Sequence, residues 1–159
     1  MPYTPRLHIV LHEPEIPYNA GNIGRTCVAV GAKLWMVRPL GFSVDDYYVR
    51  RAGLDYWELL DWEVCDDWQT LTSRLDAGRM WFFSKTGVRN HTEAQFAEGD
   101  VLVFGSESKG LPPAILAERR ERVLRMPMRP EMRSLNLSNT AAIAAYEALR
   151  QWGFTGLEE

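Results

Sequence analysis

Short apolar segments alternate with helix-like segments along the whole chain, and this alternation limits the possible folds more than any other feature. The apolar segments have the length and side chains of buried strands. They are Leu7–Leu11, Lys33–Val37, Arg79–Phe83, Val101–Phe104 and Val123–Met126. Strands that alternate with helices predict an α/β domain with a parallel sheet.

The expected helices lie between these strands. Their ranges are 23–30, 45–60 with a break at Gly53, 67–75, 112–118 and 137–152. The chain of 159 residues has the size of one ordinary domain, and it contains no repeat or interdomain linker. We therefore expect a single domain over residues 1–159.

Composition excludes several classes of site and leaves one question open. Cys27 and Cys65 lie too far apart for a paired zinc motif, and the three histidines have no metal-ligand spacing, so no metal is expected. No segment approaches the ~20 apolar residues that span a bilayer, so we expect a soluble, cytoplasmic protein without a membrane partner. The net charge of −3 gives no overall reason to expect a nucleic-acid partner, but arginines crowd residues 119–133. That run fits a solvated face or a phosphate-binding face equally well.

Three polar segments follow predicted strands, which is where open α/β sheets bind their ligands. The first, Asn19–Arg25, is rich in small residues and ends in an arginine that would project from the first helical turn. The second, Phe104–Pro112, contains two glycines and a carboxylate but matches neither a Walker A loop nor G-x-G-x-x-G. The third, Met126–Asn139, carries more Ser and Asn side chains than one helix cap needs.

Each segment also has a purely structural interpretation. The first could be a capped helix start with a solvent-exposed arginine, and one Ser or Asn of the third could simply cap the last helix. Spacing alone does not separate these interpretations from ligand binding.

Taken together and in order, the three segments resemble the three motifs of the SPOUT class of methyltransferases. The matching ranges are Asn19–Arg25, Leu102–Leu111 and Met126–Ser138, and with the strands between them they cover nearly the whole chain. The resemblance implies a deep trefoil knot that forms the S-adenosylmethionine site, both within roughly residues 79–152. It also implies a homodimer whose RNA site is built from two subunits.

Two further segments resemble one compact subgroup of that class. Glu13–Pro17 and Arg50–Tyr56 are similar to enzymes that methylate the 2'-hydroxyl of the wobble cytidine or uridine in leucine tRNA anticodons. The implied partner is therefore tRNA. The same chemistry on another tRNA or ribosomal RNA site, and an inactive RNA-binding module of the same fold, are the alternatives.

The resemblance also assigns residue roles. The catalytic set is Arg25, Asn19, Asn136 and Ser138, and the cofactor-binding set is Phe83, Gly105, Glu107, Met126, Ser134 and Leu135, with Glu107 bracing its own loop. A guanidinium is a poor base at neutral pH, because it already carries its proton. We therefore expect Arg25 to grip a phosphate and orient the ribose, while Asn19, Asn136 and Ser138 hold the arginine and the ribose.

Overall fold

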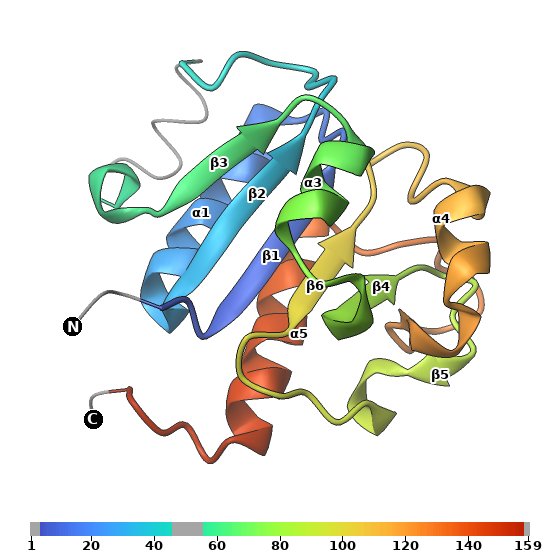
Figure 1. The fold of residues 1–159 in the computed structure, drawn as a ribbon. Helices are drawn as coiled ribbons and strands as arrows, with labels where there is room; N and C mark the ends of the chain where they lie inside the picture. Colours follow the sequence, from blue (N-terminus) through green and yellow to red (C-terminus); the bar gives the residue numbers. More distant parts are fainter. Residues whose placement is uncertain (1–3, 46–55, 158–159) are drawn as a thin grey trace.

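The computed structural model describes residues 4–45 and 56–157, and its centre is a sheet of seven parallel strands (Figure 1). The spatial order is β3-β2-β1-β6-β4-β7-β5. In chain order the strands are β1 (Leu7–His12), β2 (Ala32–Val37), β3 (Trp62–Cys65), β4 (Met80–Phe83), β5 (Arg89–Asn90), β6 (Val101–Phe104) and β7 (Val123–Arg125). The predicted α/β class with a parallel sheet is confirmed.

Helices cover both faces of this sheet (Figure 1). Helices α1 (Pro17–Val30) and α5 (Leu137–Gln151) pack on one face, and α3 (Trp68–Arg74) and α4 (Pro113–Glu118) on the other. Four 3-10 turns complete the set: η1 (Trp57–Leu59), η2 (Ala77–Arg79), η3 (His91–Glu93) and η4 (Arg120–Arg122). Within the described ranges no helix is long and apolar enough to cross a membrane.

The strands are apolar on both sides because both faces of the sheet are covered. In β1, Ile9 and Leu11 face α1 and α5, whereas Val10 joins the core under α3 and α4. Each of these side chains is fully buried, which stabilises the fold by about 1.5–3 kcal/mol per residue. The two cores hold the strand ends, and so the loops that follow them, in fixed positions.

Helix α1 begins at Pro17, six residues before the predicted start at Ile23. The turn-forming composition of residues 17–22 suggested a loop, but Pro17 occupies the first turn, where its fixed φ favours a helix. The predicted end is confirmed, because Gly31 closes the helix in the left-handed conformation with φ 77°. The first motif is therefore helical, and Arg25 lies in the third turn rather than the first.

Two strands were not expected from the sequence. Strand β3 pairs with β2, and the two-residue β5 pairs with β7 at the opposite edge. Of the helix expected over 45–60, residues 46–55 lie outside the described residues, while 57–59 form the 3-10 turn η1 and Leu60 is extended. Neither new strand is a continuous apolar run, because β3 contains Glu63 and β5 consists of Arg89 and Asn90.

The chain leaving β4 turns back onto β7. Ser84 N donates to Leu124 O at 2.9 Å, and Val88 N donates to Val123 O at 3.1 Å. Gly87 lies between them against the β7 backbone, where a Cβ would come within 2.4 Å of Leu124 C. This crossing requires glycine, and it lies within the segment where the knot is expected. The threading of the knot itself stays a prediction.

Substituting Gly87 by alanine should destabilise the fold, because the β7 backbone cannot yield to the added methyl group. We expect a loss of at least about 2 kcal/mol in the free energy of unfolding, measured by urea denaturation. Gly78→Ala is the matched control, since its Cβ would approach only the Asp76 side chain, at 3.2 Å. Equal stability of the two variants would contradict the tight crossing.

Candidate cofactor and RNA site

The carboxyl ends of β6, β4 and β7 bring together predicted cofactor residues from three separate parts of the chain. Phe83 is paired in register with Phe104 on one side and Leu124 on the other. Gly105 directly follows Phe104, and Met126 is two residues after Leu124. Both therefore lie near the end of β4, where Phe83 is. The Phe83 and Phe104 rings are stacked at 4.7 Å between centroids, which leaves an apolar floor at this edge.

The loop after β6 folds tightly on itself. Gly110 N donates to Ser106 O at 2.9 Å, and Gly110 has a φ of +67°. A Cβ at Gly105 would lie 2.1 Å from Gly110 C, so only glycine fits there. The expectation that both glycines serve backbone conformation or close approach is confirmed.

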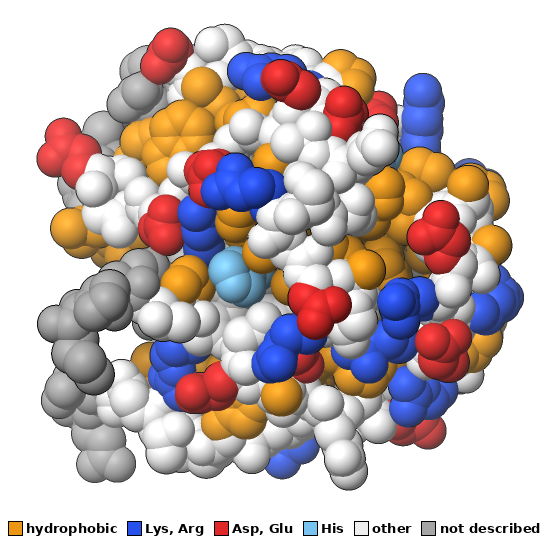
Figure 2. Space-filling model, in the orientation of Figure 1, with side chains coloured by type: hydrophobic (Ala, Val, Ile, Leu, Met, Phe, Trp, Pro, Cys, Tyr) orange, Lys and Arg blue, Asp and Glu red, His pale blue; other side chains and the backbone are white. Residues whose placement is uncertain are grey.

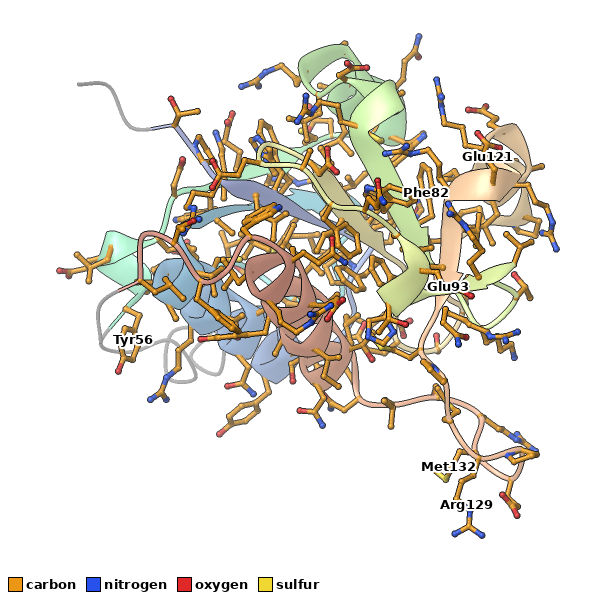
Figure 3. All side chains as sticks on the ribbon, turned by 90° about the horizontal axis from the view of Figure 1, so that it is seen from below. Tyr56, Phe82, Glu93, Glu121, Arg129 and Met132 are labelled. Atoms are coloured by element: carbon orange, nitrogen blue, oxygen red, sulfur yellow. The ribbon has the colours of Figure 1, made fainter. Side chains whose placement is uncertain are left out.

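The loop after β7 exposes its backbone. Figure 3 shows Arg129 and Met132 on a loop that projects from the body of the protein. Among the described residues, Met132 N to Arg129 O is the one backbone hydrogen bond made within 127–135. Ser134 and Leu135, on the same loop, are exposed. Its remaining peptide groups are thus available to bind a ligand.

Asn136 caps helix α5. Its Oδ1 accepts hydrogen bonds from Ser138 N at 2.9 Å, from the Ser138 hydroxyl at 2.6 Å and from Asn139 N at 3.4 Å. The structural interpretation therefore holds for Asn136 and engages Ser138 as well. The amide nitrogen of Asn136 takes no part in this cap, so the predicted roles of both residues toward the ribose stay predictions.

Glu107 joins the second motif to the first. Its carboxylate accepts hydrogen bonds from Glu15 N and Ile16 N, both at 2.8 Å, and from Asn19 Nδ2 at 3.1 Å. Ile16 is the N-cap of α1 and has no capping side chain of its own, and the first turn holds no acid. Glu107 binds the two backbone N–H groups that lead into the helix and the Asn19 side chain, and it places a negative charge at the positive end of the helix dipole.

Glu15, just before α1, in turn binds the loop that carries Glu107. Its carboxylate accepts hydrogen bonds from Ser108 N at 3.1 Å and from the Ser108 hydroxyl at 2.5 Å. These two bonds lower the pKa of Glu15, so the carboxylate stays charged at neutral pH. We call this pair of exchanged carboxylates, Glu15 and Glu107, the carboxylate clamp.

Arg25 lies on the exposed face of α1, whereas Asn19 is on the buried face. The Arg25 guanidinium is 4.7 Å from the centre of the Tyr56 ring and makes no hydrogen bond with Asn19, Asn136 or Ser138. Tyr56 and Arg129 lie at opposite ends of the view in Figure 3. Within one subunit, the predicted catalytic Arg25 therefore lies far from the projecting loop after β7.

Sequence reasoning gave no role to Glu15, Ser108 or Tyr56, although the structure involves all three. The hydrogen bonds of Glu15 cross 93 residues of sequence, so no local spacing could reveal them. An acid just before a helix whose first turn contains no acid was the one available signal.

Replacing Glu107 by alanine should leave three donors at the start of α1 without an acceptor. We expect the free energy of unfolding to fall by about 2–3 kcal/mol in urea denaturation, because a charged acceptor is lost. Glu107→Gln, which keeps one acceptor oxygen, should lose less. Glu118→Ala, an exposed site on α4, is the control and should change stability by less than about 0.5 kcal/mol. Identical stabilities for the Glu107 and Glu118 variants would refute the clamp.

Comparison with known proteins places this geometry in a family. The model of the SpoU rRNA Methylase family matches residues 6–146. Relatives named tRNA (cytidine(34)-2'-O)-methyltransferase include one from Methylovorus glucosotrophus, 47% identical over 149 residues, with 93% of this chain and 97% of the relative covered. Another from Saccharophagus degradans is 47% identical over 150 residues, covering 94% and 97%.

Solved structures agree with the sequence comparison. One, described as giving insights into the 2-OH methylation of C/U34 on tRNA, has a TM-score of 0.88 and 46% identity, and covers 93% of this chain and 97% of that one. The methyltransferase AviRb from Streptomyces viridochromogenes, in complex with AdoMet, has a TM-score of 0.84 at 23% identity, covering 98% and 61%, and shows the shared fold alone. The resemblance found in the motifs is confirmed: the chain belongs to the SpoU methylase family.

Proposed function

We propose that this protein transfers a methyl group from S-adenosylmethionine to the ribose 2'-hydroxyl of nucleotide 34, a cytidine or uridine, in leucine tRNAs. The observation that carries the proposal is the carboxylate clamp, which fixes the helix of Arg25 against the loop of Gly105. The relatives named for cytidine 34 are 47% identical over 93–94% of this chain, which supports the position on the tRNA. The two free, buried cysteines fit a reducing compartment such as the cytoplasm.

The edge formed by β6, β4 and β7 fits the cofactor. Phe83 offers an apolar floor, Gly105 lets the backbone approach closely, and the unpaired peptide groups between Met126 and Leu135 can recognise the polar edges of adenine and ribose. Ser134 lies within that stretch. Bound there, S-adenosylmethionine supplies a sulfonium methyl group for in-line transfer. Glu107 serves this site indirectly, since its oxygens are occupied by α1.

Arg25 orients the ribose of the substrate. Its guanidinium can hold a phosphate oxygen through two parallel hydrogen bonds, which fixes the neighbouring ribose for in-line attack. The proton of the 2'-hydroxyl passes to a phosphate oxygen or to water, because the guanidinium is already protonated. The Tyr56 ring holds the arginine before RNA binds, through a cation-π contact.

The position of Arg25 supports a site shared between two subunits. Arg25 is eight residues beyond Pro17, which is about 12 Å along the helix at ~1.5 Å per residue. Arg25 therefore lies well away from the strand ends of its own chain. Exposed apolar side chains lie on α1 and α5, which pack side by side: Tyr18 is 45% exposed, Ile143 43% and Tyr146 44%. A homodimer through this surface would bury them and bring Arg25 to the partner's cofactor edge.

Arg25→Lys should lower kcat for tRNA methylation by at least about tenfold while the Kd for S-adenosylmethionine stays unchanged, because lysine cannot form the bidentate contact. The assay uses methyl-labelled cofactor and unmodified tRNA, with the product mapped by nuclease digestion and nucleoside mass spectrometry. The expected product of the wild type is 2'-O-methylcytidine or 2'-O-methyluridine at position 34 of leucine tRNA. Near-full turnover by Arg25→Lys would exclude the proposed role.

Light scattering at micromolar concentration should give twice the chain mass of 18.2 kDa. Ile143→Asp combined with Tyr146→Asp should shift the protein to monomer, because two charges would be buried in the interface. Val88→Asp, which alters an apolar residue that is 49% exposed beyond the β4 strand end, should remain dimeric. A monomeric wild type would defeat the shared site.

A further inference from the structure

Arginines at one edge of the sheet lack acidic partners. Among the described residues, six of them form no salt bridge, although the chain as a whole is negatively charged. They are Arg89, Arg119, Arg120, Arg122, Arg125 and Arg133, and we call them the arginine edge. Elsewhere, Arg6, Arg38, Arg74, Arg79 and Arg150 each pair with a carboxylate. Figure 2 shows several Lys and Arg side chains, with some Asp and Glu side chains among them, over the side of the molecule where η4 and β5 lie.

Neutral groups hold two of these arginines in place. Arg122 Nε donates to Met80 O at 2.7 Å, and its guanidinium lies 3.8 Å from the centre of the Trp81 ring. Arg89 lies 5.5 Å from the same ring and donates to Glu121 O, a backbone carbonyl, at 2.7 Å. A carbonyl and an indole ring orient a guanidinium without neutralising it. The positive charge therefore stays available to a ligand.

The charges also repel one another. Burial is the main cause that lowers the pKa of Arg122, and the nearby charges of Arg119 and Arg89 lower it further, against Asp100 and Glu121. Holding like charges together costs stability unless an anion binds between them. A solvated face that served only solubility would have no need for fixed, clustered guanidinium groups.

The arginine edge leads toward the cofactor site. Arg89 on β5 and Arg125 on β7 occupy adjacent strands at the outer limit of the sheet, and Arg125 Nε donates to Asn90 Oδ1 at 2.9 Å. Turn η4 precedes β7, and Arg133 is on the projecting loop that follows it (Figures 1 and 3). Arg122 ends η4 and Arg125 ends β7, so these guanidinium groups lie at two separate points along the same edge.

We infer that the arginine edge binds the phosphate backbone of the RNA substrate, outside the nucleotide that is methylated. The inference rests on the proposed function for the identity of the RNA. A row of separate guanidinium groups suits a polymer of phosphates better than one small anion, and its continuity with the projecting loop directs that polymer to the site.

The test is the triple variant R89Q/R120Q/R125Q, which keeps long polar side chains and removes three charges. Binding to full-length unmodified tRNA is measured by filter binding between 50 and 200 mM salt. We expect about tenfold weaker binding or more, and a slope of log K against log salt that is smaller by about 2–3, close to one per lost phosphate contact. The control is R38Q/R74Q, whose arginines pair with acids near β3 and should leave the slope unchanged.

Two further measurements separate the possible outcomes. Titration calorimetry with S-adenosylmethionine should give the wild-type Kd for the triple variant, so a general folding defect would be detected. If the triple variant binds tRNA with the wild-type affinity and slope, the inference is overturned. If the variant loses the binding of the wild type to phosphatidylserine vesicles while its tRNA binding stays intact, the arginine edge is a membrane-binding surface instead. The wild type could also prove unable to transfer a methyl group to tRNA, while the triple variant still binds tRNA more weakly than the wild type. That result would support the RNA-binding surface and reject the proposed function.

Discussion

The carboxylate clamp joins the loops after β1 and β6, and the functional part of the structure depends on this contact. Glu107 accepts hydrogen bonds from the backbone that leads into α1, a helix without a capping side chain of its own, and Glu15 binds the backbone and side chain of Ser108 in return. Because β1 and β6 are neighbours in the sheet, this contact is short in space although 93 residues separate its ends. It fixes the direction in which α1, and with it Arg25, leaves the sheet.

The same arrangement separates two tasks. The strand ends of β6, β4 and β7 present glycine and exposed backbone, which suit a nucleoside-like ligand. The outer surface of α1 presents Arg25 away from them, beside Tyr56. In the dimer that we propose, a second subunit completes the site, and by our inference the unpaired arginines along β5 and β7 extend it over a longer stretch of RNA. A chain with a net charge of −3 can bind a polyanion in this way because its positive charge is concentrated at one edge.

The fold could be predicted from sequence as far as local pattern carried information. Five strands, β1, β2, β4, β6 and β7, and the last helix were recognised because their apolar residues form clear runs, and both glycines of the second motif were correctly assigned to backbone geometry. The start of α1 was placed at Ile23 instead of Pro17, since part of what stabilises residues 17–22 as a helix is an acceptor on Glu107. The short strand β5 exists through its pairing with β7, which no local pattern encodes. Motif resemblance predicted the site residues, but it could not show that Asn19 lies on the buried face of α1 and Arg25 on its exposed face.

Complementation between two inactive chains tests the shared site most directly. One chain carries Arg25→Ala, and the other carries Gly105→Val, whose side chain would collide with Gly110 and close the cofactor loop. After the two are mixed equally and allowed to exchange subunits, half of the dimers should be mixed, each with one intact site. Methylation of tRNA should then recover to about a quarter of the wild-type rate. If the mixture stays as inactive as its parents although mixed dimers form, Arg25 and the cofactor loop act within one subunit and the account is wrong.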